Sequence, residues 1–290
     1  MLLAHGAAAS AWTWVPHPDV WLLLGALGGA YVAVLYLIGP RVLPYGESPT
    51  TTRQQLLFLA GLTTLWIGAD WPVHDLSEDF LLSVHMIQHL LFTFVAPPLL
   101  LLGLPGWLLR MFLRPRGLMA AARFLTRPLV ALVLFNGVIA VTHWPLLVNA
   151  SLGSELVHFG IHVLLVVSAG IMWWPVVAPL PETATLEPPA KMFYLFLQSI
   201  LPTVPASFLT FSDRVIYSFY ADVPRLWEWM DPVTDQRVAG LMMKLLGGLI
   251  LWGVIAVIFF RWNAREEARD RGEIPWDDFE RELESYNLRP

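Results

Sequence analysis

The segment HMIQHLLFTFVAPPLLLLGLP, residues 85–105, decides the fold class of this chain. It contains no Asp, Glu, Lys or Arg, and a helix that crosses a bilayer needs about 20 mostly apolar residues. We therefore predict a membrane-spanning helix here. Pro97 and Pro98 lie past its middle and should deform its inner half, because proline lacks the N–H that an α-helix needs.

The composition of the whole chain supports a membrane protein. Of its 290 residues, 56% are hydrophobic and only 14% are charged, whereas charged residues make up about a quarter of a soluble domain. A soluble enzyme is thereby excluded. The net charge is -5 without a basic block interleaved with aromatics, so no nucleic-acid partner is expected. We see no nucleophile with a base, phosphate loop or pair of buried acids, and predict no enzyme activity.

Six further apolar stretches lead us to predict an all-α, polytopic membrane protein with a seven-transmembrane-helix bundle. The predicted spans are residues 20–39, 54–72, 80–104, 128–145, 156–178, 191–211 and 238–260. They form one membrane domain, residues 1–262, followed by a charged cytoplasmic tail, residues 263–290. Gln198, Pro202 and Pro205 interrupt the sixth stretch, so we expect a bent helix there.

Basic residues concentrate in the connections after spans one, three and five and at the start of the tail. They are Arg41, Arg53, Arg110, Arg114, Arg116, Arg123, Arg127, Lys191, Arg261, Arg265 and Arg269. The opposite side has Arg214, Arg225 and Arg237, which are outnumbered by acids. Because Lys and Arg favour the cytoplasmic side, we predict an outer N-terminus and a cytoplasmic C-terminus.

The two ends of the chain carry weaker signals. The first residues, MLLAHGAAASAWTW, lack the positive n-region of a secretory signal, so we expect a retained N-terminus. In the tail, Phe279, Leu283 and Tyr286 follow helical spacing. They predict a short amphipathic helix on the membrane surface.

All eight histidines fall on the predicted outer side of the membrane. His5 and His17 lie in the N-terminal segment, and His74 and His143 lie at the outer ends of spans two and four. The others form two i, i+4 pairs: His85 with His89, in HMIQH, and His158 with His162, in HFGIH. Residues four apart share a helix face, so each pair can direct both imidazoles towards one ion.

Two facing pairs would supply four imidazole nitrogens to a metal site. The chain has no Cys, which excludes disulfides, iron–sulfur clusters and thiolate-based copper sites. Imidazole sites suit copper, zinc and iron, and copper or a haem iron is the natural candidate. Met86 and Met172 are candidate soft ligands for Cu(I), although Met in a membrane helix usually fills apolar space. Asp70, one turn before His74, either orients that imidazole from outside or caps the second span.

Other readings of the polar residues stay open. A histidine near a membrane interface often only hydrogen-bonds a neighbouring helix. Asn136, on the face of His143 but deeper, is expected to hydrogen-bond another helix. Lys244 is the one Lys in the interior of a predicted span, since Lys191 stands at the first position of the sixth. A Lys in this place suggests a retinal Schiff base in a seven-helix protein, but the third span offers no carboxylate counter-ion. We instead expect Lys244 to extend towards the outer interface or to pair with Asp235 or another loop acid.

The same residues resemble a known family. HMIQHLLFTFVAPPLLLLGLP is similar to the signature of the caa3-type CtaG family of cytochrome c oxidase assembly factors, H-M-x-Q-H followed by A-P-P-L-L-x-L-G-x-P. THWP at 142–145, the HFGIH helix ending in WWP at 173–175, and DQRVAGLMM at 235–243 resemble further elements of that family. The resemblance covers residues from about 55 to 262. Lys244-Leu-Leu-Gly stands where many members have Trp-x-Pro-Gly.

The resemblance implies a role in forming active cytochrome c oxidase through copper delivery or insertion, in a multi-pass protein of the bacterial plasma membrane. The implied partners are oxidase subunits, a copper donor on the outer side and the lipid bilayer. Combining this with the spacing, we predict Cu(I) held mainly by His85, His89, His158 and His162, with His74 and His143 as auxiliary ligands or at the entrance. The alternatives are a haem b-binding redox protein and a scaffold for oxidase assembly that binds no metal.

Overall fold

The protein is described here by a computed structural model, which covers residues 11–271, and every described element is helical. The predicted tail helix around Phe279 lies outside these residues. The helices are α1 (Pro18–Ala33), α2 (Gly39–Val42), α3 (Thr52–Ala69), α4 (Val73–Asp79), α5 (Leu82–Leu90), α6 (Ala96–Gly103), α7 (Gly106–Phe112), α8 (Arg116–Leu125), α9 (Pro128–Thr142), α10 (Pro145–Leu152), α11 (Glu155–Val177), α12 (Pro188–Ile200), α13 (Thr203–Phe211), α14 (Phe219–Asp222) and α15 (Pro232–Asp270). Two π-helical turns, η1 (Val34–Ile38) and η2 (Leu91–Val95), join α1 to α2 and α5 to α6.

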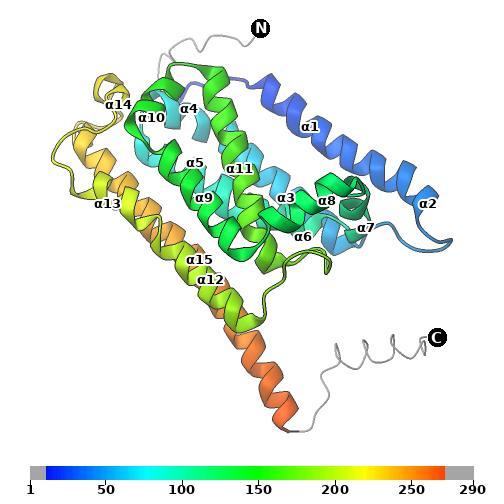
Figure 1. Ribbon diagram of the computed structural model, residues 1–290. Helices are drawn as coiled ribbons and strands as arrows, with labels where there is room; N and C mark the ends of the chain where they lie inside the picture. The colour runs from blue at the N-terminus through cyan, green and yellow to red at the C-terminus, as the bar shows by residue number, and fades with distance from the viewer. Residues whose placement is uncertain (1–10, 272–290) are drawn as a thin grey trace.

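The long helices form an up-and-down bundle. We call the end where α1, α5, α11 and α15 begin the upper end, and the opposite end, which carries α7, α8 and the loop after α11, the lower end (Figure 1). The short helices α4, α10 and α14 lie at the upper end. α15 has 39 residues, or about 58 Å of helix, and its last turns extend below all the others.

Six helical segments are long and apolar enough to cross a membrane. They are Pro18–Val42, Thr52–Asp79, Leu82–Gly103, Glu155–Val177, Pro188–Phe211 and Pro232–Asp270. These correspond to six of the seven predicted spans. The fourth differs, because α9 has only 15 residues and reaches spanning length only with α8, at a bend of 79°. Pro128 begins α9 and separates it from α8, which buries no residue. The described bundle thus has six candidate spans, or seven if the bent pair counts as one.

The prolines of the third span disturb the helix as predicted. The π-helical turn η2 precedes Ala96, Pro97 and Pro98, and neither proline can donate to the carbonyl of Thr93. The indole Nε1 of Trp173 on α11 donates to this carbonyl instead, at 2.9 Å. A neighbouring helix therefore completes the hydrogen bonding of the interrupted one, as a membrane interior requires.

The sixth span is also interrupted where the sequence predicts, between α12 and α13 at Leu201 and Pro202. Lys244 of α15 lies at this break and donates to the carbonyl of Ser199 at 3.3 Å and to the hydroxyl of Thr203 at 2.5 Å. The predicted partner of Lys244 was wrong, because Asp235 is occupied elsewhere and the polar groups at the break are nearer. Asn136 does bridge helices, and donates to Gln198 of α12 at 2.7 Å.

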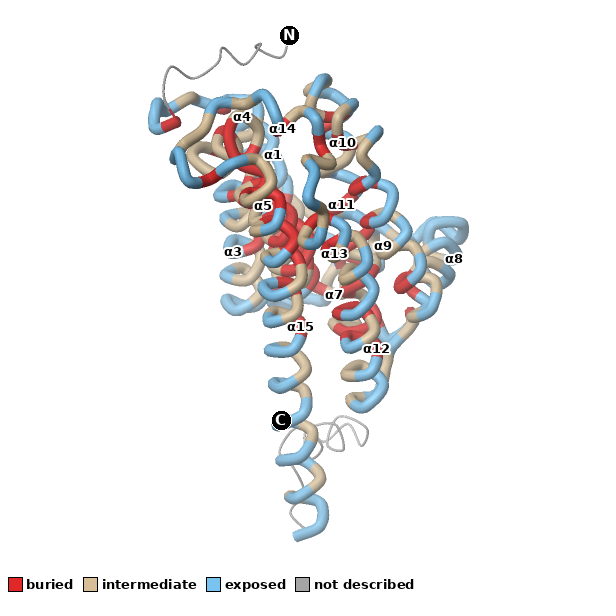
Figure 2. Tube along the Cα trace, turned by 90° about the vertical axis from the view of Figure 1, so that its left-hand side faces the viewer, coloured by how far each residue is buried: buried red, intermediate tan, exposed pale blue. Residues whose placement is uncertain are grey.

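The core runs along the centre of the bundle, where α5 is the most deeply buried helix (Figure 2). α3 packs closely on α6 at Gly103, which has no side chain to separate the two helices. A Cβ at this position would lie 2.5 Å from the backbone nitrogen of Phe58. Tyr31 donates to the carbonyl of Gly103 at 2.9 Å and ties α1 to the same point. These contacts join α1, α3 and α6, and α6 continues from α5 through the turn η2.

Candidate metal centre

Seven of the eight histidines lie at the upper end, and their rings form a connected group; His5 is outside the described residues. The ring centroids of neighbouring members lie 4.2–6.4 Å apart, from His17 through His74, His158, His162 and His85 to His89 and His143. The elements that supply them are distant in sequence. Folding therefore brings together the histidines that the sequence assigned to one side.

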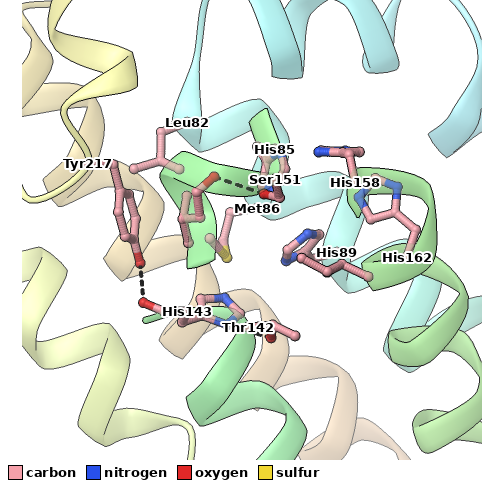
Figure 3. Close-up of a pocket in the computed structure, with 12 residues that line it drawn as sticks. Leu82, His85, Met86, His89, Thr142, His143, Ser151, His158, His162 and Tyr217 are labelled. Atoms are coloured by element: carbon pink, nitrogen blue, oxygen red, sulfur yellow. Dashed lines mark hydrogen bonds between the residues drawn. The ribbon is translucent and has the colours of Figure 1, made fainter. Parts of the chain in front are cut away.

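The closest group consists of His85, His89 and His162. One nitrogen from each lies within 4.8 Å of the other two. His85 and His89 are on α5 and His162 is on α11, so one member of the HFGIH pair faces both members of the HMIQH pair (Figure 3). We call these three side chains the inner trio.

The inner trio borders a cavity of about 20 Å³, which has room for roughly one water molecule or ion. His143, Met86 and Tyr217 also line it (Figure 3). Several imidazole nitrogens here are buried without a hydrogen-bond partner among residues 11–271. They are Nδ1 of His85, both nitrogens of His89, and Nε2 of His143 and of His162. Buried polar atoms are normally satisfied, so this arrangement requires an explanation.

His143 has its tautomer fixed by the backbone. Its Nδ1 is 2.8 Å from the carbonyl oxygen of Ile139, and a carbonyl can only accept, so the proton lies on Nδ1. The lone pair of the neutral ring is then on Nε2, the nitrogen without a partner. Metal-binding histidines commonly donate their other nitrogen to a carbonyl in this way. The unprotonated Nε2 of His143 thus lies in the histidine group beside His89, with their ring centroids 5.5 Å apart.

A carboxylate that the sequence analysis did not single out lies on the other side of His158. Oε1 of Glu78 is 3.0 Å from Nε2 of His158 and 3.4 Å from Nε2 of His74. The i, i+4 spacing of His74 and Glu78 within VHDLSED was the signal that could have found it. His158 thus lies between Glu78 and the inner trio, with its ring centroid 4.2 Å from that of His162.

The remaining predicted residues have different surroundings. The carboxylate of Asp70 accepts from Nε1 of Trp21 and of Trp66, both at 2.6 Å, so Glu78 rather than Asp70 is the acid beside the ring of His74. Met86 lines the cavity. Met172 is fully buried in α11 but ten residues beyond His162, or about 15 Å along the helix, and does not line it.

Residues from other helices hold the histidines in place. The carboxylate of Asp235, on α15, accepts from the backbone N–H groups of Leu82 and Ser83 at 2.7 and 3.1 Å and so caps the start of α5. Nε2 of Gln88 donates to the carbonyl of Gly68 at 2.7 Å and lies 3.3 Å from Nδ1 of His74. The helix that supplies His85 and His89 is therefore fixed to α15 and to the end of α3.

Two groups outside the spans add to the electrostatics of the upper end. The hydrogen bond from His17 to Asp75, at 3.1 Å, raises the pKa of His17 against the opposing effect of burial. Burial raises the pKa of the Tyr217 phenol, which therefore stays protonated and donates to the carbonyl of His143 at 3.0 Å. Both groups support histidines from the loops that cover the site.

Comparison with known proteins identifies the family. The model of a family described as cytochrome c oxidase caa3 assembly factor, Caa3_CtaG, matches residues 30–265. The chain belongs to the Caa3_CtaG family. Its matched region contains every described histidine of the site except His17.

Two curated relatives of this Caa3_CtaG protein come from Mycobacterium bovis and Mycobacterium tuberculosis, and both are described only as uncharacterised proteins. Each is 24% identical over 286 residues, which cover 91% of this chain and 42% of the relative. The chain therefore spans less than half the length of these relatives. No solved structure matches it.

The family-like motifs can now be read as structural parts of this Caa3_CtaG chain. In HMIQH, the histidines face the cavity and Gln88 anchors the helix. In APP and WWP, Trp173 supplies to the carbonyl of Thr93 the donor that Pro97 lacks. In DQRVAG, Asp235 caps α5, and Gly240 lets α15 approach α13, because a Cβ there would lie 2.8 Å from the carbonyl oxygen of Ala206. Each motif positions α5 or α11.

Proposed function

We propose that this protein assists cytochrome c oxidase assembly by holding a copper ion, in the Cu(I) state, at the inner trio and passing it to the oxidase. The family supports the assembly role. One observation supports the copper role: imidazole nitrogens that are buried without hydrogen-bond partners surround a cavity with room for a single ion. His85, His89 and His162 would hold the ion, with His143 as a further ligand and Met86 as a soft neighbour.

The arrangement suits transfer better than permanent storage. Bonds from imidazole to first-row metals are about 2.0–2.1 Å long, so two ligands of one ion lie no more than about 4.2 Å apart. The trio nitrogens lie within 4.8 Å of one another, so that at most small side-chain rotations would bring them onto an ion. Three imidazoles alone would leave one position on the ion open for an exchanging ligand.

The upper end would face the outside of the bacterial plasma membrane. Arg110, Arg123 and Lys191 lie at the lower end, which is then cytoplasmic by the preference of basic residues. In this orientation the site could receive copper from an outer donor. Haem b is the poorer alternative, since cofactor pockets are about 300–1,000 Å³ and this cavity has about 20 Å³.

The test is the copper content of the purified protein. We expect the full chain in lipid nanodiscs to bind one Cu(I) under anaerobic competition with a chelator, and His85→Asn combined with His89→Asn to lose it. Met172→Leu, a change in a buried residue away from the cavity, is the matched control and should bind as the native chain does. Full binding by the double variant would overturn the assignment and leave the scaffold role, in which histidine changes reduce only stability.

A further inference from the structure

The strongest observation outside the inner trio is the convergence of His74, Glu78 and His158. Both Nε2 atoms lie close to the same oxygen, Oε1 of Glu78, at 3.4 Å for His74 and 3.0 Å for His158. Two of these side chains come from α4 and the third from α11. Two imidazoles that flank one carboxylate form a common metal-binding donor set.

Two members of this second group lie nearer the surface than His85 and His89 of the inner trio. The side chains of His74 and Glu78 are 16% and 18% exposed, whereas His158 is 7% exposed, the same as His85 and His89. The ring of His158 lies 4.2 Å from His162 and 5.6 Å from His85 by centroids. His158 is therefore the contact between the exposed group and the buried one.

The outer group is also supported from behind. Gln88 lies 3.3 Å from Nδ1 of His74, and the ring of His17 packs edge-on against that of His74 at 4.9 Å. Asp75 holds His17 in turn. Partners that fix the orientation of a ligating ring are typical of metal sites.

The two groups differ in their preferred ion. The inner trio offers imidazole, with the thioether of Met86 nearby, which suits soft Cu(I). The outer group adds a carboxylate, a hard oxygen ligand that favours a divalent ion. A negative charge among the donors also compensates more of the charge of a divalent ion than neutral imidazoles can.

We propose that His74, Glu78 and His158 form a second metal position, which binds a divalent ion such as Cu²⁺ or Zn²⁺ at the outer edge of the histidine group. The idea that an ion passes from this outer position to the inner trio rests on the proposed copper function. Binding of a divalent ion at the outer position does not rest on it. No change of copper oxidation state is assigned to either position.

The test measures divalent binding separately from Cu(I) binding. Full-length protein in nanodiscs is titrated with Cu²⁺ in air, with electron paramagnetic resonance to detect nitrogen ligands, and with Zn²⁺ by calorimetry. We expect Glu78→Gln to weaken both by at least tenfold, because it removes the charged oxygen ligand. The same variant should keep its Cu(I) site. Glu155→Gln, which removes a carboxylate at the start of α11, is the matched control and should bind as the native chain does.

The outcomes separate the two proposals. Unchanged Cu²⁺ and Zn²⁺ affinity in Glu78→Gln overturns the outer position, whatever the inner trio does. Retained Cu(I) in the His85 and His89 double variant overturns the proposed function, whatever Glu78 does. If Glu78→Gln does not fold, judged by its circular dichroism and elution, His74→Gln replaces it, and unchanged divalent affinity in that variant overturns the proposal equally.

Discussion

The two ends of the bundle treat their polar residues in opposite ways. At the upper end, His17, Asp75, His89 and Asp235 are all buried. At the lower end, α8 buries no residue, and Arg110 and Glu182 form an ion pair whose side chains are 49% and 37% exposed. Buried ionisable side chains thus gather at the upper end, whereas the ion pair of the lower end is exposed.

This difference shows where polar residues carry structural information. A buried polar group must be matched by a partner or it destabilises the protein, so the upper end depends on particular atoms. The two groups of an exposed ion pair can replace their mutual contact by contacts with water, at little change in the free energy of folding. Substitutions should therefore have large effects at the upper end and small ones at the lower end.

The largest effect on stability is expected from Asp235→Ala. It removes the acceptor of two buried N–H groups at the start of α5, and losing a helix cap costs about 2 kcal/mol at the high end. Equilibrium unfolding in mixed micelles measures the loss. Asp213→Ala is the control at the same end, because Asp213 is 91% exposed and pairs with Arg237. Equal losses in the two variants would show that burial does not set the difference.

An intermediate effect is expected from pH at His17. Asp75 raises the pKa of His17 in the folded state, so this pair stabilises the protein fully below the unfolded histidine pKa of about 6.5. The stabilisation is lost as the pH rises through the raised folded value. We expect about 1 kcal/mol, the usual net contribution of a hydrogen bond. Unfolding measured from pH 6 to 9 should show the loss in the native chain and not in His17→Asn; identical profiles would contradict the assignment.

The smallest effect is expected at the lower end, from Glu182→Gln. Its hydrogen bond with Arg110 holds the pKa of Glu182 below the usual carboxyl value, so any stabilisation exists above the unfolded pKa and is lost as the pH falls through the lowered one. Exposed pairs contribute a few tenths of a kcal/mol, and salt screens them. Unfolding in low and high salt should hardly distinguish the variant. A salt-independent loss like that of Asp235→Ala would remove the contrast between the ends.

Much of this architecture follows from the sequence because bilayer helices are set by local composition. The interruption at Pro202 and the distortion beside Pro97 follow from local properties of proline, its missing N–H and its bulky ring. The position of the histidines at one end follows from counting spans. The fourth span was less predictable, because the apolar run 128–145 includes His143 and Trp144, where the structure already ends α9.

The donor set could be predicted only in part, because it depends on how helices face each other. Periodicity puts His158 and His162 on one face of α11. It does not predict which of the two rings turns towards His85 and which turns towards Glu78. The orientation of α4 decides that Glu78, rather than Asp70, reaches His74. The cap of α5 by Asp235 joins residues more than 150 positions apart, a distance at which a single sequence gives no pairing signal.

The hydrogen bond from Trp173 to the carbonyl of Thr93 has a consequence for how the protein is made. While the chain enters the membrane in order, α5 and α6 arrive before α11, and the carbonyl of Thr93 then lacks the donor that completes it. An unsatisfied carbonyl in hydrocarbon costs several kcal/mol, so the third span reaches its final form only when Trp173 docks. The two histidine-bearing helices therefore reach their final packing together, so the histidine group can assemble only after α11 has docked.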